Sequence, residues 1–146
     1  METGAPQQPT IQFETWADVS NAIQKSRIPS SGVPRLVVVC FCTPWNPTSR
    51  MSARYFKELS EGPDARFAKI SIVNAEAELS ACHSMTIHAT PAVQFYWDGQ
   101  LLTIRRPDWD DDTKFVGSTT KENWLELIRY ARDAGLKHNS ILYVQF

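Results

Sequence analysis

The chain has 146 residues, of which 42% are hydrophobic and 21% are charged. These values are ordinary for a globular domain, and the length is enough for one domain with a substantial core. Fifteen basic and sixteen acidic residues give a formal charge of −1, which lacks the basic surplus of a typical nucleic-acid-binding domain. We therefore expect no tight direct binding to nucleic acid. No apolar run approaches the roughly 20 residues that span a bilayer, so we expect no membrane segment.

The N-terminal segment differs from the rest of the chain. Residues 1–10 contain Pro, Gln and Gly, without the basic and apolar regions of a signal peptide. We interpret them as a disordered lead-in, and residues 11–146 as one domain with a C-terminal tail. The three cysteines, Cys40, Cys42 and Cys82, are an odd number for a disulfide framework and indicate a reducing compartment.

The first elements are a helix and a buried strand. The helix is expected to begin at Thr15 and to end before Pro29, because apolar residues recur between them at helical spacing. The continuous β-branched run at residues 36–42 predicts a strand that is covered on both faces. Asn46 and Pro47 then form an N-cap and first-turn pair for a second helix. Its expected inner face consists of Met51, Tyr55 and Leu59.

The middle of the chain predicts a second strand at residues 67–73 and a short helix at residues 75–85. Leu79 and Cys82 are expected to face inward from that helix. After Pro91, two apolar segments flank Asp98-Gly99, which is a strong two-residue hairpin signal. The hairpin strands are expected at residues 92–97 and 100–104.

The last helix is expected to begin with a capping box formed by Thr119 and Glu122. Gly135 is expected to end it, and a further strand is expected within residues 141–146. The predicted inner face consists of Trp124, Leu127, Ile128 and Ala131. The complete order, α-β-α-β-α-β-β-α, is that of the thioredoxin fold, although order alone leaves several α/β folds open.

Residues 37–51 resemble the thioredoxin active-site segment, in which a buried strand leads to Trp and then to Cys-x-x-Cys at a helix start. Trp45, Arg50 and Met51 match that segment, whereas Asn46 and Ser49 stand at the two cysteine positions. Thr90-Pro91 matches the family's cis-proline segment. The resemblance implies an α/β thioredoxin fold, with a central mixed sheet flanked by helices and a C-terminal extension.

The two replacements at the cysteine positions remove the family's chemistry. A helix N-terminus activates the first thiol of Cys-x-x-Cys, and the second thiol resolves the mixed disulfide. Asn46 has no sulfur, and Ser49 has no adjacent base in sequence to activate it. Cys40 and Cys42 point to one strand face with Cα atoms about 6.6 Å apart, a poor geometry for a bridge. We expect no catalytic residue, and we interpret all three cysteines as buried apolar side chains.

A closer resemblance is to the Dim-type, thioredoxin-like 4 splicing proteins, especially the 4B subgroup. Their Trp/Glu-Asp-Pro-x-Cys segment is similar to residues 45–49, and their long loop after the hairpin matches residues 112–118. Their Lys-containing helix start and C-terminal extension correspond to residues 120–121 and 136–146. The family usually has a cysteine at the position of Ser49, so this chain departs from it there. The resemblance implies a nuclear, non-catalytic protein that binds spliceosomal proteins.

Metal and cofactor sites find little support in the sequence. Asp108 to Asp112 resembles the opening of a calcium loop but lacks its later Gly and Glu, and is interpreted as a solvated acidic loop, with Arg105 and Arg106 as candidate counter-charges. The histidines have no zinc-ligand spacing. We expect no metal and no cofactor.

Two surfaces are candidates for partner binding. One is the former active-site groove, with Trp45 and Pro47 facing Thr90-Pro91. The other is the loop of residues 105–118, which is long for this fold and is preferred because it carries family-specific residues. Its predicted contact residues are Trp109, Asp111 and Phe115, although Phe115 and Val116 packing against the last helix is an equal alternative.

Three functions follow from these observations. The first is a non-catalytic spliceosomal component, with a homodimer as a further possible assembly. The second is a thiol redox protein or sensor that uses Cys40, Cys42 or Cys82, which the missing Cys-x-x-Cys disfavours. The third is a redox-inactive peptide-binding module outside splicing, which the loop of residues 112–118 disfavours.

Overall fold

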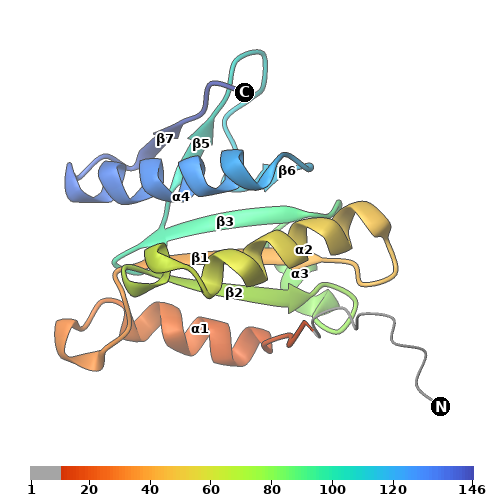
Figure 1. Ribbon diagram of the computed structural model, residues 1–146, viewed down its shortest axis with the longest axis horizontal. Coiled ribbons are helices and arrows are strands. Elements are labelled where there is room, and N and C mark those ends of the chain that lie inside the picture. The colour runs from red at the N-terminus through yellow and green to blue at the C-terminus, as the bar shows by residue number, and fades with distance from the viewer. Residues whose placement is uncertain (1–10) are drawn as a thin grey trace.

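The strand β1 (Leu36–Cys42) lies inside the main sheet of the computed structural model, which describes residues 11–146 (Figure 1). The prediction of a lead-in at residues 1–10 lies outside the described residues. The other strands are β2 (Ala68–Asn74), β3 (Ala92–Trp97), β4 (Gln100–Leu101), β5 (Thr103–Arg105), β6 (Phe115–Val116) and β7 (Ile141–Tyr143). The helices are α1 (Trp16–Lys25), α2 (Pro47–Ser60), α3 (Leu79–Ser84) and α4 (Lys121–Leu136), with 3-10 turns at Pro29–Ser31 and Pro63–Arg66.

The main sheet is mixed, as predicted. Within residues 11–146 it has five strands in the order β2-β1-β3-β4, and β6 also pairs with β3. The strand β1 is parallel to β2 and antiparallel to β3, so that Leu36 lies between Ala68 and Trp97. All seven residues of β1 are buried, because helices cover both faces of the sheet. This burial explains the continuous apolar run in the sequence.

Successive residues of β1 contribute to two separate cores. Val38, Cys40 and Cys42 belong to the core beneath α2 and α4. Val39 and Phe41 belong to the core beneath α1 and α3. The buried apolar residues of α1 belong to the second core, whereas the large buried apolar residues of α2 and α4 belong to the first, so α1 covers the opposite face of the sheet. The alternation follows from the two-residue period of a strand.

The predicted hairpin strand at residues 100–104 is divided between two sheets. β4 pairs with β3 across Asp98-Gly99, and Leu102 N donates to Phe95 O at 2.8 Å. The chain then turns away, and β5 pairs in parallel with β7 in a separate two-stranded sheet. The alternating pattern could not reveal this division, because the partner of β5 is about forty residues away in the sequence.

The C-terminal extension belongs to the core. The expected strand within residues 141–146 is present as β7. Leu142 and Val144 are buried in the core that contains α2 and α4. Val144 N also donates to Arg105 O at 2.9 Å, which extends the contact between the tail and β5.

Two helix faces differ from the prediction. Met51 of α2 is 48% exposed, whereas Ala53, Phe56 and Leu59 face the core. Small buried residues form the part of this face in the first turns of α2. The sequence prediction considered only large apolar side chains at four-residue spacing and therefore missed them. Leu79 of α3 is 69% exposed and only Cys82 faces inward, since α3 begins at Leu79 and is shorter than predicted.

The helix α4 keeps its predicted inner face but has different ends. Its N-cap is Thr120, whose hydroxyl accepts from Asn123 N at 3.1 Å, instead of Thr119. Gly135 is still helical and does not end the helix. A Cβ at Gly135 would lie 2.0 Å from Trp97 Cδ2, so this glycine is required by the close approach of α4 to β3.

Candidate functional site

The start of α2 holds Asn46 and Ser49, which the sequence resemblance aligns with the two cysteine positions of thioredoxins. Asn46 is the N-cap, and its Oδ1 accepts from Ser49 N at 3.1 Å. The Ser49 Oγ accepts from Thr43 N at 3.0 Å, and Ser49 is fully buried. Asn46 and Ser49 therefore satisfy backbone N–H groups at the helix start. Among the described residues, no histidine or carboxylate hydrogen-bonds to Ser49.

The Thr90-Pro91 peptide bond is cis, as predicted. Thr43 Oγ1 and Thr90 Oγ1 are 2.6 Å apart, so the segment before α2 is hydrogen-bonded to the cis-proline segment. The structure thus brings the predicted site residues Asn46, Ser49 and Pro91 into one region of the molecule. Hydroxyl and amide groups occupy the centre of this region, where a thioredoxin carries its thiols.

Apolar side chains surround this region on the surface. The Trp45 side chain is 70% exposed, and Met51 is also exposed. Pro47 is exposed at the first position of α2. Exposed aromatic side chains are frequent anchors in protein interfaces, so Trp45 makes this surface a candidate for protein binding without any chemistry.

The three cysteines are free and buried. Burial raises the pKa of Cys40 well above its ordinary value, and the neighbouring Cys42 acts in the same direction. Burial also raises the pKa of Cys42 to about 11, although Arg50 opposes this. The pKa of Cys82 is raised by burial and by Glu78. Because these pKa values are raised, the three thiols are predominantly protonated near neutral pH, and the thiolate is the reactive form.

The second candidate surface, the loop between β5 and β6, is held by several contacts. Two backbone hydrogen bonds join Ile104 and Asp112. Arg105 forms a two-pronged ion pair with Asp111, with distances of 2.9 and 2.7 Å. The Arg106 guanidinium carbon lies 4.4 Å from the centroid of the Trp109 ring. These contacts give the loop a defined shape, and Figure 1 shows it beside β7 and the C-terminus.

The predicted contact residues of this loop have different environments. Trp109 is 59% exposed, and Asp111 is exposed but paired with Arg105. Phe115 is only 2% exposed, and its ring lies 5.2 Å from that of Trp124. The prediction that Phe115 binds a partner is therefore wrong, and the alternative of packing against the last helix is correct for Phe115 but not for Val116, which packs against the opposite core. Val116 is half-buried in β6, where it pairs with Ala92.

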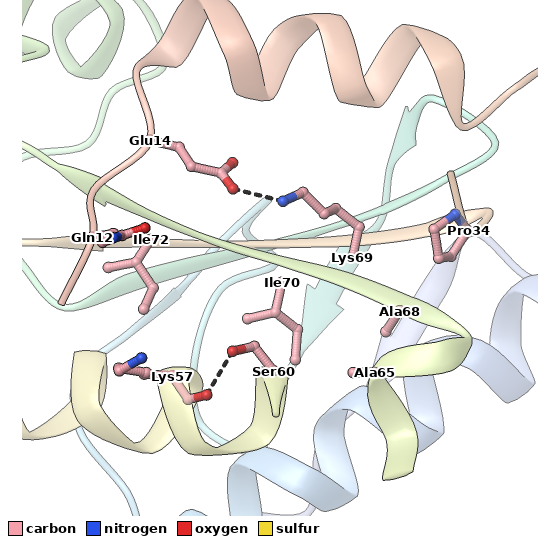
Figure 2. Close-up of a pocket in the computed structure, with 10 residues that line it drawn as sticks. All are labelled: Gln12, Glu14, Pro34, Lys57, Ser60, Ala65, Ala68, Lys69, Ile70 and Ile72. Atoms are coloured by element: carbon pink, nitrogen blue, oxygen red, sulfur yellow. Dashed lines mark hydrogen bonds and ion pairs between the residues drawn. The ribbon is translucent and has the colours of Figure 1, made fainter. Parts of the chain in front are cut away.

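A hollow beside the edge strand β2 was not found from the sequence. Its volume is about 360 Å³, and the ion pair between Glu14 and Lys69 lies along its wall (Figure 2). Its lining residues are Gln12, Glu14, Pro34, Lys57, Ser60, Ala65, Ala68, Lys69, Ile70 and Ile72. Four separate segments supply these residues, so no local motif could have indicated the hollow.

The described residues offer no preformed metal site. Among residues 11–146 there is no group of three or more His, Cys, Asp or Glu side chains that could hold an ion. The rings of His83 and His88 are 6.5 Å apart, but both are exposed and lack a third ligand in that part of the chain. In the same residues, no helix combines the length and apolar character that a membrane span requires.

Comparison with known proteins identifies the fold. No family model and no curated protein sequence matches the chain. Among solved structures, Trxlp from Edwardsiella tarda EIB202 is similar with a TM-score of 0.59 and 15% identity, covering 82% of this chain and 98% of that one. Fasciola hepatica thioredoxin has a TM-score of 0.58 and 22% identity, covering 79% and 92%.

Mitochondrial thioredoxin 3 from Saccharomyces cerevisiae is also similar, with a TM-score of 0.56 and 13% identity, covering 79% of this chain and 89% of that one. The chain therefore has the thioredoxin fold. These identities are low, so the similarity concerns the arrangement of helices and strands. The predicted fold class is confirmed.

Proposed function

We propose that this protein is a non-catalytic, protein-binding component of the splicing machinery. The observation that carries the first part is that Asn46 and Ser49 stand at the two redox positions of the resemblance, where each accepts a hydrogen bond from one backbone N–H group. The resemblance of residues 45–49 and 112–118 to the Dim-type splicing proteins supports the second part. We expect nuclear localisation for the same reason.

Three properties favour binding over thiol chemistry. Ser49 is fully buried, so its hydroxyl cannot be reached by a substrate. The remaining thiols are buried and have raised pKa values. In contrast, Trp45 and Trp109 expose large aromatic surfaces, as residues that anchor partners do.

Of the two surfaces, we favour the loop of residues 105–118 as the principal docking site. The loop has a defined shape, so a partner would not have to order it on binding. The surface at Trp45 has features that any thioredoxin-fold protein without its cysteines would retain. The loop also includes residues 112–118, where the resemblance to the splicing proteins is most specific.

The test is affinity purification from nuclear extract with the full chain as bait, followed by quantitative mass spectrometry. Trp109→Ala and Trp45→Ala are matched variants, because each removes one exposed indole. Both should first be shown to unfold at the same temperature as the wild-type protein. We expect wild type and Trp45→Ala to retain splicing proteins, and Trp109→Ala to lose them.

Two results would contradict the proposal. If the wild-type chain enriches no splicing proteins over a bead control, the splicing assignment fails. If Trp45→Ala loses the partners and Trp109→Ala retains them, the groove is the docking site. The absence of redox catalysis is tested separately by insulin reduction with dithiothreitol, where wild type and the Cys40→Ser, Cys42→Ser double variant should both remain at background.

A further inference from the structure

The loop between β5 and β6 exposes the side chain of Trp109, and backbone hydrogen bonds join the two ends of the loop. Ile104 N donates to Asp112 O at 2.6 Å, and Asp112 N donates to Ile104 O at 3.1 Å. Within the loop, Trp109 N donates to Arg106 O at 3.3 Å. The backbone that carries Trp109 is therefore fixed on both sides of the residue.

The indole of Trp109 is anchored to the core through Arg106. The Arg106 guanidinium carbon lies 4.4 Å from the centroid of the Trp109 ring and 4.0 Å from that of the buried Phe115 ring. Arg106 Nε also donates to Phe146 O at 3.0 Å. This stack holds the indole while 59% of Trp109 stays exposed. A rigid, exposed indole loses little conformational entropy on binding.

The charges around Trp109 are not balanced. Asp111 is paired with Arg105, and Asp112 is paired with Lys114. Asp108 and Asp110, the two sequence neighbours of Trp109, are exposed and form no ion pair with any described residue. Two carboxylates without an ion-pair partner among the described residues therefore flank Trp109 in the sequence, and Arg106, the cation in contact with the ring, forms no ion pair with either of them. A basic partner at Trp109 would be attracted by these carboxylates, whereas an acidic partner would be repelled.

We propose that Trp109, Asp108 and Asp110 form a binding site for a basic segment of a protein partner. Apolar side chains of that segment pack on the exposed part of the indole, and its Lys or Arg side chains pair with the two carboxylates. This inference rests on the proposed binding function and specifies the chemistry of the partner. Arg106 is a positioning residue, because it acts by holding the ring.

The experiment uses a random 12-residue peptide library displayed on phage, selected on the full chain and depleted on the Trp109→Ala variant. We expect the enriched peptides to combine Lys or Arg with aliphatic or aromatic residues. An enriched peptide should bind Trp109→Ala at least about 30-fold more weakly, as interface tryptophans do. The Asp108→Asn, Asp110→Asn double variant should weaken binding about threefold to tenfold and reduce its salt dependence, as rim charges do. Trp45→Ala is the control and should bind like wild type.

Three outcomes would overturn the inference: enriched peptides that are acidic or uncharged, no peptide that distinguishes wild type from Trp109→Ala, or equal binding by the double-Asn variant. These outcomes are distinguishable from failure of the proposed function. If the purified bait retains splicing proteins but the library gives no basic peptides, only the partner chemistry is wrong. If the library gives basic peptides that need Trp109 but no splicing protein is purified, the site stands and the splicing assignment fails.

Discussion

The thiol of Cys42 lies at the end of β1, where both faces of the sheet are covered. Burial raises its pKa from 9.0 to about 11, so the folded protein keeps the proton to higher pH than the unfolded chain. Between pH 9 and 11 the unfolded state therefore binds fewer protons, and stability falls as pH rises. Well below pH 9 both states hold the proton, and this thiol contributes almost no pH dependence.

We predict that the free energy of unfolding falls by up to about 1.4 kcal/mol per pH unit for each such thiol above pH 9. Urea denaturation at pH 7, 8, 9.5 and 10.5 measures this dependence. The Cys42→Ala variant should show a shallower fall above pH 9 and the same slope as wild type between pH 7 and 8. Equal slopes above pH 9 would show that Cys42 does not titrate abnormally.

Gly135 provides a second test at the residue scale. A Cβ there would lie 2.0 to 2.5 Å from three atoms of the Trp97 ring. Alanine is the better helix former by about 1 kcal/mol, but overpacking typically costs about 1–3 kcal/mol and occasionally more. Contacts as short as 2.0 Å place the overpacking cost at the upper end of that range, so we predict that Gly135→Ala lowers the free energy of unfolding by about 2 kcal/mol.

Gly62→Ala is the matched control, because its Cβ would meet only two backbone oxygens, at 3.5 and 3.8 Å. This variant should be close to neutral. A Gly135→Ala protein as stable as wild type would mean that Trp97 moves aside without cost, and that α4 approaches β3 less closely than described.

At the scale of elements, the N-terminus of α4 distinguishes two adjacent threonines. Thr120 Oγ1 accepts from Asn123 N, whereas Thr119 Oγ1 accepts from the side chain of Asn123 at 2.7 Å. Loss of an N-cap costs about 1 kcal/mol. We predict that Thr120→Ala destabilises the protein by about that amount and that Thr119→Ala has a smaller effect, as measured by chemical denaturation. A larger loss of stability for Thr119→Ala than for Thr120→Ala would show that Thr119 is the N-cap, as the sequence suggests.

Helix starts and strand bounds that depend on residues close together in the chain could be predicted from the sequence. Asn46 is an N-cap as expected, and the first helix begins directly after Thr15, close to its expected start, because capping depends on residues within one turn. The bounds of β1 follow from its unbroken apolar run. The division of residues 100–105 between β4 and β5 could not be predicted, since it depends on pairing with β7, far along the chain.

The candidate site was predictable in part for the same reason. The segment that contains Asn46 and Ser49 is a local motif, and the structure brings it next to Thr90. The exposure of Trp109 and the burial of Phe115 depend on how the loop folds onto α4. An apolar residue in a loop gives no sequence signal that separates these two outcomes.

At the scale of the whole molecule, the near-neutral charge bears on nucleic-acid binding. A net charge of −1 provides few unpaired cations for the counterion release that drives phosphate binding. We predict that the isolated protein binds single-stranded and duplex RNA no more tightly than micromolar at physiological salt. Fluorescence anisotropy at two salt concentrations measures this, and a submicromolar, salt-sensitive affinity would contradict it.

The participation of the tail in the core has a consequence for biosynthesis. Leu142 and Val144 belong to the same core as Val38 of β1 and Trp124 of α4. A ribosome releases the chain from its N-terminus, so this core cannot close until residue 144 has emerged. The opposite core, beneath α1 and α3, draws on residues between Val19 and Tyr96 and can form much earlier. We therefore expect the nascent protein to pass through a stage with one face of its sheet covered and the other bare, in which the uncovered apolar face favours association with other chains.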